Sequence, residues 1–291
     1  MKQKIGYILL KGACVLVGFM PLWLAYNTLS PLLFFVLYHV VGYRRKVVVT
    51  NLKNSFPEKS DKEIKDIERK FYHNLADVFV DTIRMASLSK KEVQRRLVFD
   101  NLEVMPNKDT ICAMAHYGSW ELSVSYGLIP DQHTIGIYRP LHSKVFDKFY
   151  IFMRRRFGSD VAPMNYILKD IINKRRDPNA LPLTIAMIAD QTPGRKEQRH
   201  WHNFLNQETS FFGGIEKIST KFEMPIYFAN MTMPKRGYYV CHFELIYDGV
   251  EKVEQAEITR RYAEKLEKMI RQRPELWLWS HRRWKHKRPQ E

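Results

Sequence analysis

Residues 111–121 read Ile-Cys-Ala-Met-Ala-His-Tyr-Gly-Ser-Trp-Glu, and this stretch decides the expected fold. An apolar run typical of a buried strand leads into His116, and Gly118 then allows the chain to turn. Ser119 stands where a helix N-cap is expected, which would place Glu121 in the first turn of that helix. A strand that turns directly into a helix is the building unit of an α/β fold.

The same turn predicts a catalytic pair. Glu121 can fold back onto the His116 ring, fix its tautomer and leave the other ring nitrogen to take a proton from a hydroxyl. Histidine followed five positions later by an acid also occurs at His142 and His286, so the spacing alone is weak. His116 is distinguished by its place at a strand-to-helix turn, and the alternative is a histidine that only completes a buried polar network.

The flanking sequence continues the alternation of strands and helices. Sequence patterns predict strands over 110–115, 134–138, 183–189, 226–232 and 238–245, and helices over 60–87, 146–157, 167–174, 214–222 and 256–272. This order predicts a mixed, mostly parallel sheet flanked by helices.

Further polar residues stand at the ends of these elements. Arg139 ends one predicted strand, at the sheet edge where open α/β folds bind ligands. The run at 154–156 is Arg-Arg-Arg, in which Arg154 and Arg156 are candidates for binding phosphate oxygens. Asp190 and Gln191 follow another apolar strand; they are candidates for a substrate site, with loop capping as the alternative.

Residues 12–43 contain no Asp, Glu, Lys or Arg, which predicts a hydrophobic segment that is retained as a membrane anchor. Pro21, Asn27 and Pro31 favour either one tilted helix or two shorter helices that meet near Asn27. A buried core hairpin is the alternative. We therefore expect an anchor over 1–43 and one catalytic domain over 44–291.

The amino-acid composition indicates which classes of partner the protein can bind. Lys and Arg number 47 against 31 Asp and Glu, a formal net charge of +16, which indicates an anionic partner such as anionic lipid, an acidic carrier protein or nucleic acid. The three cysteines, Cys14, Cys112 and Cys241, lie far apart in apolar runs, as reduced buried thiols do. Neither a metal site nor a cofactor is expected, because His200 and His202 lack further ligands nearby.

These motifs together resemble the late, or secondary, acyltransferases of bacterial lipid A biosynthesis, within the wider lysophospholipid acyltransferase superfamily. Four pieces carry the resemblance in order: His-Tyr-Gly-Ser-Trp-Glu at 116–121, Tyr-Arg-Pro at 138–140, Ala-Asp-Gln at 189–191 and Pro-Glu-Leu-Trp-Leu-Trp-Ser-His-Arg-Arg-Trp-Lys at 274–285. With the apolar N-terminus, the similarity spans nearly the whole chain.

The resemblance implies a glycerolipid acyltransferase-like fold and an enzyme at the cytoplasmic face of the bacterial inner membrane. It implies acyl carrier protein as the donor and a phosphorylated glycolipid, the lipid A precursor, as the acceptor, with no cofactor. Its implied catalytic residues are His116 as base and Glu121 as partner. The implied pocket residues are Arg139, Arg154, Arg156, Asp190 and Gln191.

Two other interpretations remain open from the sequence. The acceptor could instead be a glycerophospholipid, an aminolipid or another glycolipid. A membrane-tethered nucleic-acid binder would use the basic, aromatic tail, although it would leave the His116 turn without a role and no nucleic-acid-binding motif is present.

Overall fold

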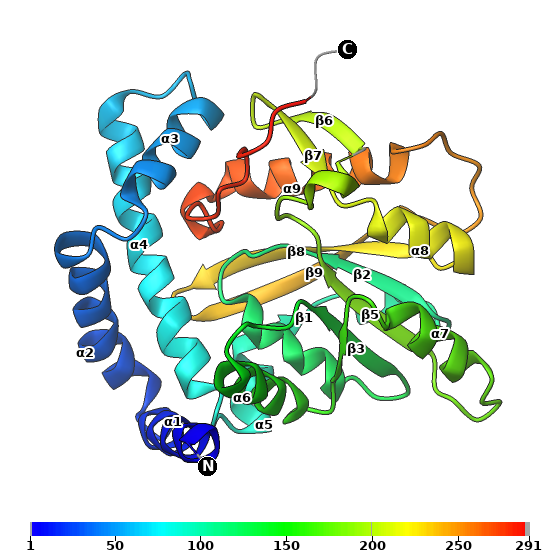
Figure 1. Ribbon diagram of the computed structural model, residues 1–291, viewed down its shortest axis with the longest axis horizontal. Helices are drawn as coiled ribbons and strands as arrows, with labels where there is room; N and C mark the ends of the chain where they lie inside the picture. The colour runs from blue at the N-terminus through cyan, green and yellow to red at the C-terminus, as the bar shows by residue number, and fades with distance from the viewer. Residues whose placement is uncertain (1, 199, 289–291) are drawn as a thin grey trace.

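A seven-stranded sheet forms the centre of the chain in the computed structural model, which describes residues 2–198 and 200–288 (Figure 1). The strand order is β1-β9-β8-β2-β5-β3-β4; β8 and β9 run antiparallel and the other neighbouring pairs run parallel. The strands are β1 Leu97–Phe99, β2 Thr110–Met114, β3 His133–Tyr138, β4 Asp160–Pro163, β5 Leu183–Ile188, β8 Ile226–Lys235 and β9 Tyr238–Tyr247. The predicted mixed, mostly parallel sheet is confirmed.

Helices surround this sheet, and a separate two-stranded hairpin of β6 His200–Phe204 and β7 Gln207–Phe211 lies above it in Figure 1. The longest helix, α4, begins with a capping box, because the Ser60 hydroxyl accepts from the Glu63 N–H and Glu63 accepts from the Ser60 N–H at 2.8 Å. The helices that follow the N-terminal region are α3 Arg45–Ser55, α4 Asp61–Arg84, α5 Lys90–Arg96, α6 Lys144–Arg155, α7 Ile167–Arg175, α8 Gly214–Phe222 and α9 Glu257–Gln272.

The elements differ from the expected ones in several respects, and helices α3 and α5 were not predicted. The short strands β1 and β4 and the β6–β7 hairpin were not predicted, because they are too short or too polar to show a strand pattern. The segment after Gly118 is a 3₁₀ helix, η3 Trp120–Leu128, and not the expected α-helix. Ser119 makes no side-chain cap to it, so the predicted cap is wrong.

The N-terminal region forms two helices, α1 Lys2–Gly18 and α2 Leu22–Phe35, followed by a short π-helix, η1 Val36–Val40. The break lies at Pro21 and not near Asn27, whose side chain donates to Trp23 O at 2.8 Å within α2. No single described helix has both the length and the apolar character to cross a bilayer. A bent pair, Leu22–Val40 with Arg45–Ser55, meets the test together across an angle of 88°.

One face of α2 is fixed to α4 by polar contacts. Tyr26 donates to Asp81 at 2.9 Å, and Ser30 donates to Asp77. On the opposite face of α2, Leu32 and Phe35 are 60% and 54% exposed. Buried residues from both sides of position 43, including Cys14, share one hydrophobic cluster, and the domain boundary at that position stays a prediction.

Candidate functional site

His116 lies just beyond the carboxyl end of β2, next to the end of β5. Since β2 and β5 are parallel neighbours, the residues that follow them meet at one edge of the sheet. Asp190 follows β5 and binds His116 twice: the ring Nδ1 lies 2.6 Å from Oδ1, and the backbone N–H donates to Oδ2 at 2.9 Å. The structure therefore pairs His116 with a carboxylate that is 74 residues away in the sequence.

Asp190 is a buried carboxylate that is held ionised. Burial alone would raise its pKa, but the His116 ring, its backbone N–H and the indole N–H of Trp277, 2.8 Å from Oδ2, together hold that pKa below the ordinary value. An ionised carboxylate only accepts, so Nδ1 of His116 carries a proton and donates it to Asp190. The ring nitrogen Nε2 is then the basic one, and the Gln191 amide lies 3.3 Å from it.

The turn that presents His116 depends on Gly118. Its φ of +54° is in the left-handed region, and a Cβ there would lie 2.5 Å from the Tyr239 ring. Trp120 then contacts the His116 ring edge to face, with the ring centroids 5.1 Å apart. One side of the imidazole is thus fixed by an aromatic ring.

Glu121 does not form the predicted contact with the His116 ring. Its carboxylate is instead bound by the Arg154 guanidinium in α6, through Nε at 3.1 Å and Nη2 at 2.7 Å. A bidentate arginine contact is a strong alternative partner for a carboxylate that is only 8% exposed. Burial alone would lower the pKa of Arg154, and the Glu121 charge raises it above its ordinary value.

The other predicted arginines lie in different surroundings. Arg139 is exposed at the end of β3. Arg156 donates from Nη1 to the carbonyl of Met85 and so ties the end of α6 to the end of α4. Of the two candidates in the arginine run, Arg154 is therefore the one placed beside Glu121.

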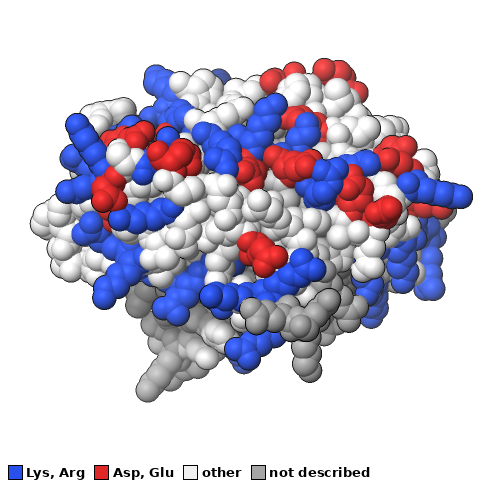
Figure 2. All heavy atoms as spheres, turned by 90° about the horizontal axis from the view of Figure 1, so that it is seen from above, with Lys and Arg blue, Asp and Glu red and all other residues white. Residues whose placement is uncertain are grey.

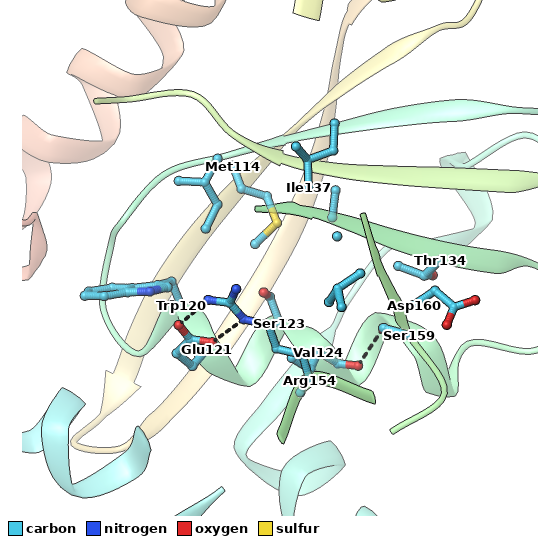
Figure 3. Close-up of a pocket in the computed structure, with 14 residues that line it drawn as sticks. Met114, Trp120, Glu121, Ser123, Val124, Thr134, Ile137, Arg154, Ser159 and Asp160 are labelled. Carbon is cyan, nitrogen blue, oxygen red and sulfur yellow. Dashed lines mark hydrogen bonds and ion pairs between the residues drawn. The ribbon is translucent and has the colours of Figure 1, made fainter. Parts of the chain in front are cut away.

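A narrow cavity of about 70 Å³ begins next to this group (Figure 3). Trp120, Glu121 and Arg154 line it, and Trp120 also touches the His116 ring. Its remaining wall is mostly aliphatic and comes from β2, β3, β4, β5 and η3: Met114, Val124, Ile137, Val161, Ala186 and Ile188. The cavity thus connects the polar group to an apolar slot over the sheet.

The aromatic C-terminal segment forms another wall of the site. Leu278 N–H donates to the His116 carbonyl at 3.1 Å, and Gly118 N–H donates to the Leu276 carbonyl at 2.9 Å. Trp277, only 2% exposed, supplies the hydrogen bond to Asp190. The tail is therefore packed against the site, whereas the sequence alone allowed it to be an external binding surface.

His281 extends this support. Its Nε2 accepts from the Thr192 N–H at 3.1 Å, two residues after Asp190. Burial lowers the pKa of His281 to about 4, so the ring is neutral and able to accept at neutral pH. Sequence reasoning missed the roles of Trp277 and His281 next to Asp190. The pairing of His116 with Asp190 had one signal in the sequence: both residues follow apolar strands, which can be neighbours in a parallel sheet.

Within the described ranges 2–198 and 200–288, no three or more His, Cys, Asp or Glu side chains are grouped so as to hold a metal ion. His200 is bound to the Thr259 hydroxyl at 3.1 Å.

Comparison with known families gives one match that covers almost the whole chain. The model of the family described as bacterial lipid A biosynthesis acyltransferase matches residues 2–286. A sequence search of curated proteins gives no match.

Proposed function

Because the chain belongs to the bacterial lipid A biosynthesis acyltransferase family, we propose that it transfers a fatty acyl chain from acyl carrier protein to a hydroxyl of a lipid A precursor. The observation that carries the mechanism is the 2.6 Å contact between Nδ1 of His116 and Asp190. It leaves Nε2 as a general base, and we assign the orienting role to Asp190 in place of Glu121.

In the proposed reaction, Nε2 of His116 takes the proton of the acceptor hydroxyl as its oxygen attacks the thioester carbonyl. The new ester C–O bond forms, the C–S bond breaks, and the leaving thiolate receives the proton from the imidazolium. Asp190 stabilises the imidazolium between these steps. The Gln191 amide lies where the acceptor hydroxyl would approach Nε2, so it must give way to the substrate or help to orient it.

The slot beside Trp120 is the proposed entry for the acyl chain of the donor, and at about 70 Å³ it must widen to admit a whole fatty chain. Its aliphatic wall starts at Met114, two residues before His116, so a thioester carbonyl near the ring would direct its hydrocarbon into the slot. Glu121 holds the Arg154 guanidinium in the wall of the slot, and we propose that Arg154 also binds polar atoms of a substrate. This makes the Glu121–Arg154 pair a substrate-positioning group in the proposal.

Charge supports an acidic donor. A cavity of about 820 Å³ between α3 and the C-terminal segment is lined by five exposed cations and by one acid, Glu208. The cations are Lys46, Arg282, Lys285, Lys287 and Arg288. Figure 2 shows the molecule from above, where a row of Lys and Arg side chains crosses the lower half of the view and most Asp and Glu side chains lie higher. We call the five residues the basic C-terminal surface and propose that it receives the acidic carrier.

The apolar residues of α1 and α2 support work at a membrane. Leu16, Phe19 and Trp23 are 76%, 73% and 66% exposed, far more than a surface in water favours for side chains of this kind. We propose attachment at the cytoplasmic face of the inner membrane, where lipid A precursors and acyl carrier protein are both accessible.

A different lipid acceptor remains the second candidate, because the base and the acyl slot would serve any acceptor hydroxyl. The nucleic-acid interpretation loses its main support, since Trp277 and Trp279 are 2% and 0% exposed and are not free to stack on bases.

The proposal is tested with purified full-length protein, acyl carrier protein loaded with a fatty acid, and lipid A precursor. His116→Ala is expected to lower the rate of acyl transfer by at least about 10²-fold, as the loss of a general base does. Circular dichroism and thermal unfolding check that the variant is folded. Near-normal turnover in a folded His116→Ala protein would rule the base assignment out. Glycerol phosphate is supplied as an alternative acceptor, and an acylated product formed from it alone would show that lipid A precursor is not the acceptor.

A further inference from the structure

A third cavity lies where the α1–α2 break meets the α4–α5 junction and the β8–β9 turn. Its volume is about 660 Å³, and it shares no lining residue with the slot beside Trp120. The wall is formed by 18–23, 26–27, several residues between 84 and 95, and 236 and 238. Nothing in the proposed acyl transfer uses it.

A buried arginine with one unused group of donors forms part of this wall. Arg84 is 2% exposed; its Nε donates to Met20 O at 3.2 Å and its Nη2 to Glu92 at 3.1 Å. Both partners also line the cavity, so the guanidinium lies within the wall. Within the described part of the chain, Nη1 of Arg84 and Oγ of Ser87, another wall residue, have no hydrogen-bond partner. Unpaired buried donors are costly. Both atoms are shielded from solvent, and Ser87 Oγ packs against Gly18, so a small shift of the wall is needed before an acceptor oxygen in the cavity can reach them.

The charges around the cavity favour an anion. Three arginines line it, and Arg84 and Arg236 each have a carboxylate partner, Glu92 and Asp77. Arg95 has no ion-pair partner in the ranges that the structure describes, and it is exposed. The local balance is therefore one positive charge, and Arg95 is the exposed guanidinium that lines the cavity without a carboxylate partner in the described residues.

The rim of the cavity is apolar. Phe19 and Trp23 line it and are 73% and 66% exposed, and Leu22 lies between them. Tryptophan beside arginine is the composition of sites at the boundary between lipid headgroups and acyl chains. A soluble anion would gain nothing from this rim.

We propose that this cavity binds the phosphate headgroup of an anionic phospholipid, with the lipid chains lying against Phe19 and Trp23. The phosphate oxygens accept from the exposed Arg95, and a small shift of the wall would add Arg84 Nη1 and Ser87 Oγ as donors. The site is separate from catalysis, and it would hold the α1–α2 break at a defined depth and orientation in the membrane surface.

The test uses full-length protein and phosphatidylcholine vesicles with or without phosphatidylglycerol. Arg95→Gln is expected to weaken the phosphatidylglycerol-dependent part of binding about fivefold, which corresponds to about 1 kcal/mol for one basic residue near an anionic surface. Lys91→Gln, one turn earlier on α5 and outside the cavity lining, is the matched control and is expected to have a clearly smaller effect. Ser87→Asp places a negative charge in the cavity and is expected to abolish the phosphatidylglycerol preference.

Two further measurements separate the alternatives. Inorganic phosphate and glycerol phosphate are added as competitors; if they bind in an Arg95-dependent way while vesicles show no such dependence, the site is for a free phosphate and the lipid assignment fails. If Arg95→Gln and Lys91→Gln weakened binding to phosphatidylglycerol vesicles equally, the binding would reflect general electrostatic attraction and the proposed site would be wrong. Acyl transfer in detergent should be unchanged in all three variants, which keeps this test independent of the proposed function.

Discussion

His116 illustrates how one residue obtains its chemistry from a distant one. The carboxylate five positions later, Glu121, belongs to Arg154, whereas Asp190 supplies both an acceptor for the ring and an acceptor for the backbone N–H. Two contacts from one carboxylate fix the ring more firmly than one contact would. The basic nitrogen Nε2 is thereby directed away from Asp190.

The first prediction concerns Asp190→Asn. The amide can donate to Nδ1, which favours the wrong tautomer of His116, so kcat is expected to fall by about 10²-fold to 10⁴-fold with a small change in KM. Steady-state kinetics with both substrates measures this split.

Glu121→Gln is the comparison variant. It weakens the contact with Arg154 and leaves the His116–Asp190 pair in place, so we expect mainly a higher KM. If Glu121→Gln lowered kcat as strongly as Asp190→Asn with unchanged KM, Glu121 would be the orienting carboxylate after all.

At the scale of elements, the C-terminal segment after α9 holds the site together. Its backbone bonds to Gly118 and His116, its Trp277 bonds to Asp190, and its His281 accepts from Thr192. The side chain of Asn51 in α3 donates to two carbonyls of this segment, those of Trp279 and His281. The turn that carries His116, the end of β5 and helix α3 therefore meet at one loop.

This loop predicts a pH effect on stability. The folded pKa of His281 is about 4 against an ordinary value of 6.5, because burial disfavours the charged ring. Between these values the unfolded chain binds a proton that the folded protein does not, so the stabilising effect is complete above pH 6.5 and is lost as the pH falls toward 4. The upper limit is on the order of 3 kcal/mol.

The measurement is urea unfolding across this pH range in the native protein and in His281→Gln. The glutamine oxygen can still accept from Thr192 but does not titrate, so the variant should lose the part of the pH dependence due to His281. If the free energy of unfolding depended on pH in the same way in both proteins, His281 would have the same pKa in the folded and the unfolded chain, and the prediction would be wrong.

At the scale of the whole molecule, the basic surface and the apolar surface lie on different parts of the protein. The basic C-terminal surface lies by α3 and the tail, which Figure 1 places at the top, while the apolar α1 and α2 lie at the lower left. An acidic carrier can then approach one part of the enzyme while another part contacts lipid. The net charge of +16 adds a long-range attraction for such a partner.

The last prediction follows from this arrangement. Lys285→Glu with Lys287→Glu is expected to raise KM for acyl carrier protein about tenfold or more. The kcat with a small acyl-pantetheine donor should be unchanged, because in the proposal this surface binds the carrier and not the acyl group. Raising the salt concentration should also raise the KM of the native protein for acyl carrier protein, because salt screens the attraction between the two charged surfaces.

Lys217→Glu with Lys221→Glu on α8 carries the same change of charge far from that surface and serves as the control. A similar rise in KM in the control would show a general effect of charge. An unchanged KM in both variants would show that the carrier does not bind at the basic C-terminal surface.

The amino-acid sequence by itself determined the elements and the candidate residues. The apolar periodicities of 110–115 and 183–189 and the capping box at Ser60 were sufficient for strands and a helix, because they depend on neighbours within a few residues. The family resemblance from four motifs is confirmed by the match over residues 2–286. Short strands such as β4 carried too few residues for a pattern.

Only the tertiary structure decided which residues act on one another. The choice between Glu121 and Asp190 as the partner of His116 depends on the register of β2 beside β5, and the role of Trp277 depends on the path of the tail. The packing of α2 against α4 likewise depends on the buried partners Asp77 and Asp81. The physical reason is that a side chain takes the strongest partner within reach in space, and distance along the chain does not measure that reach.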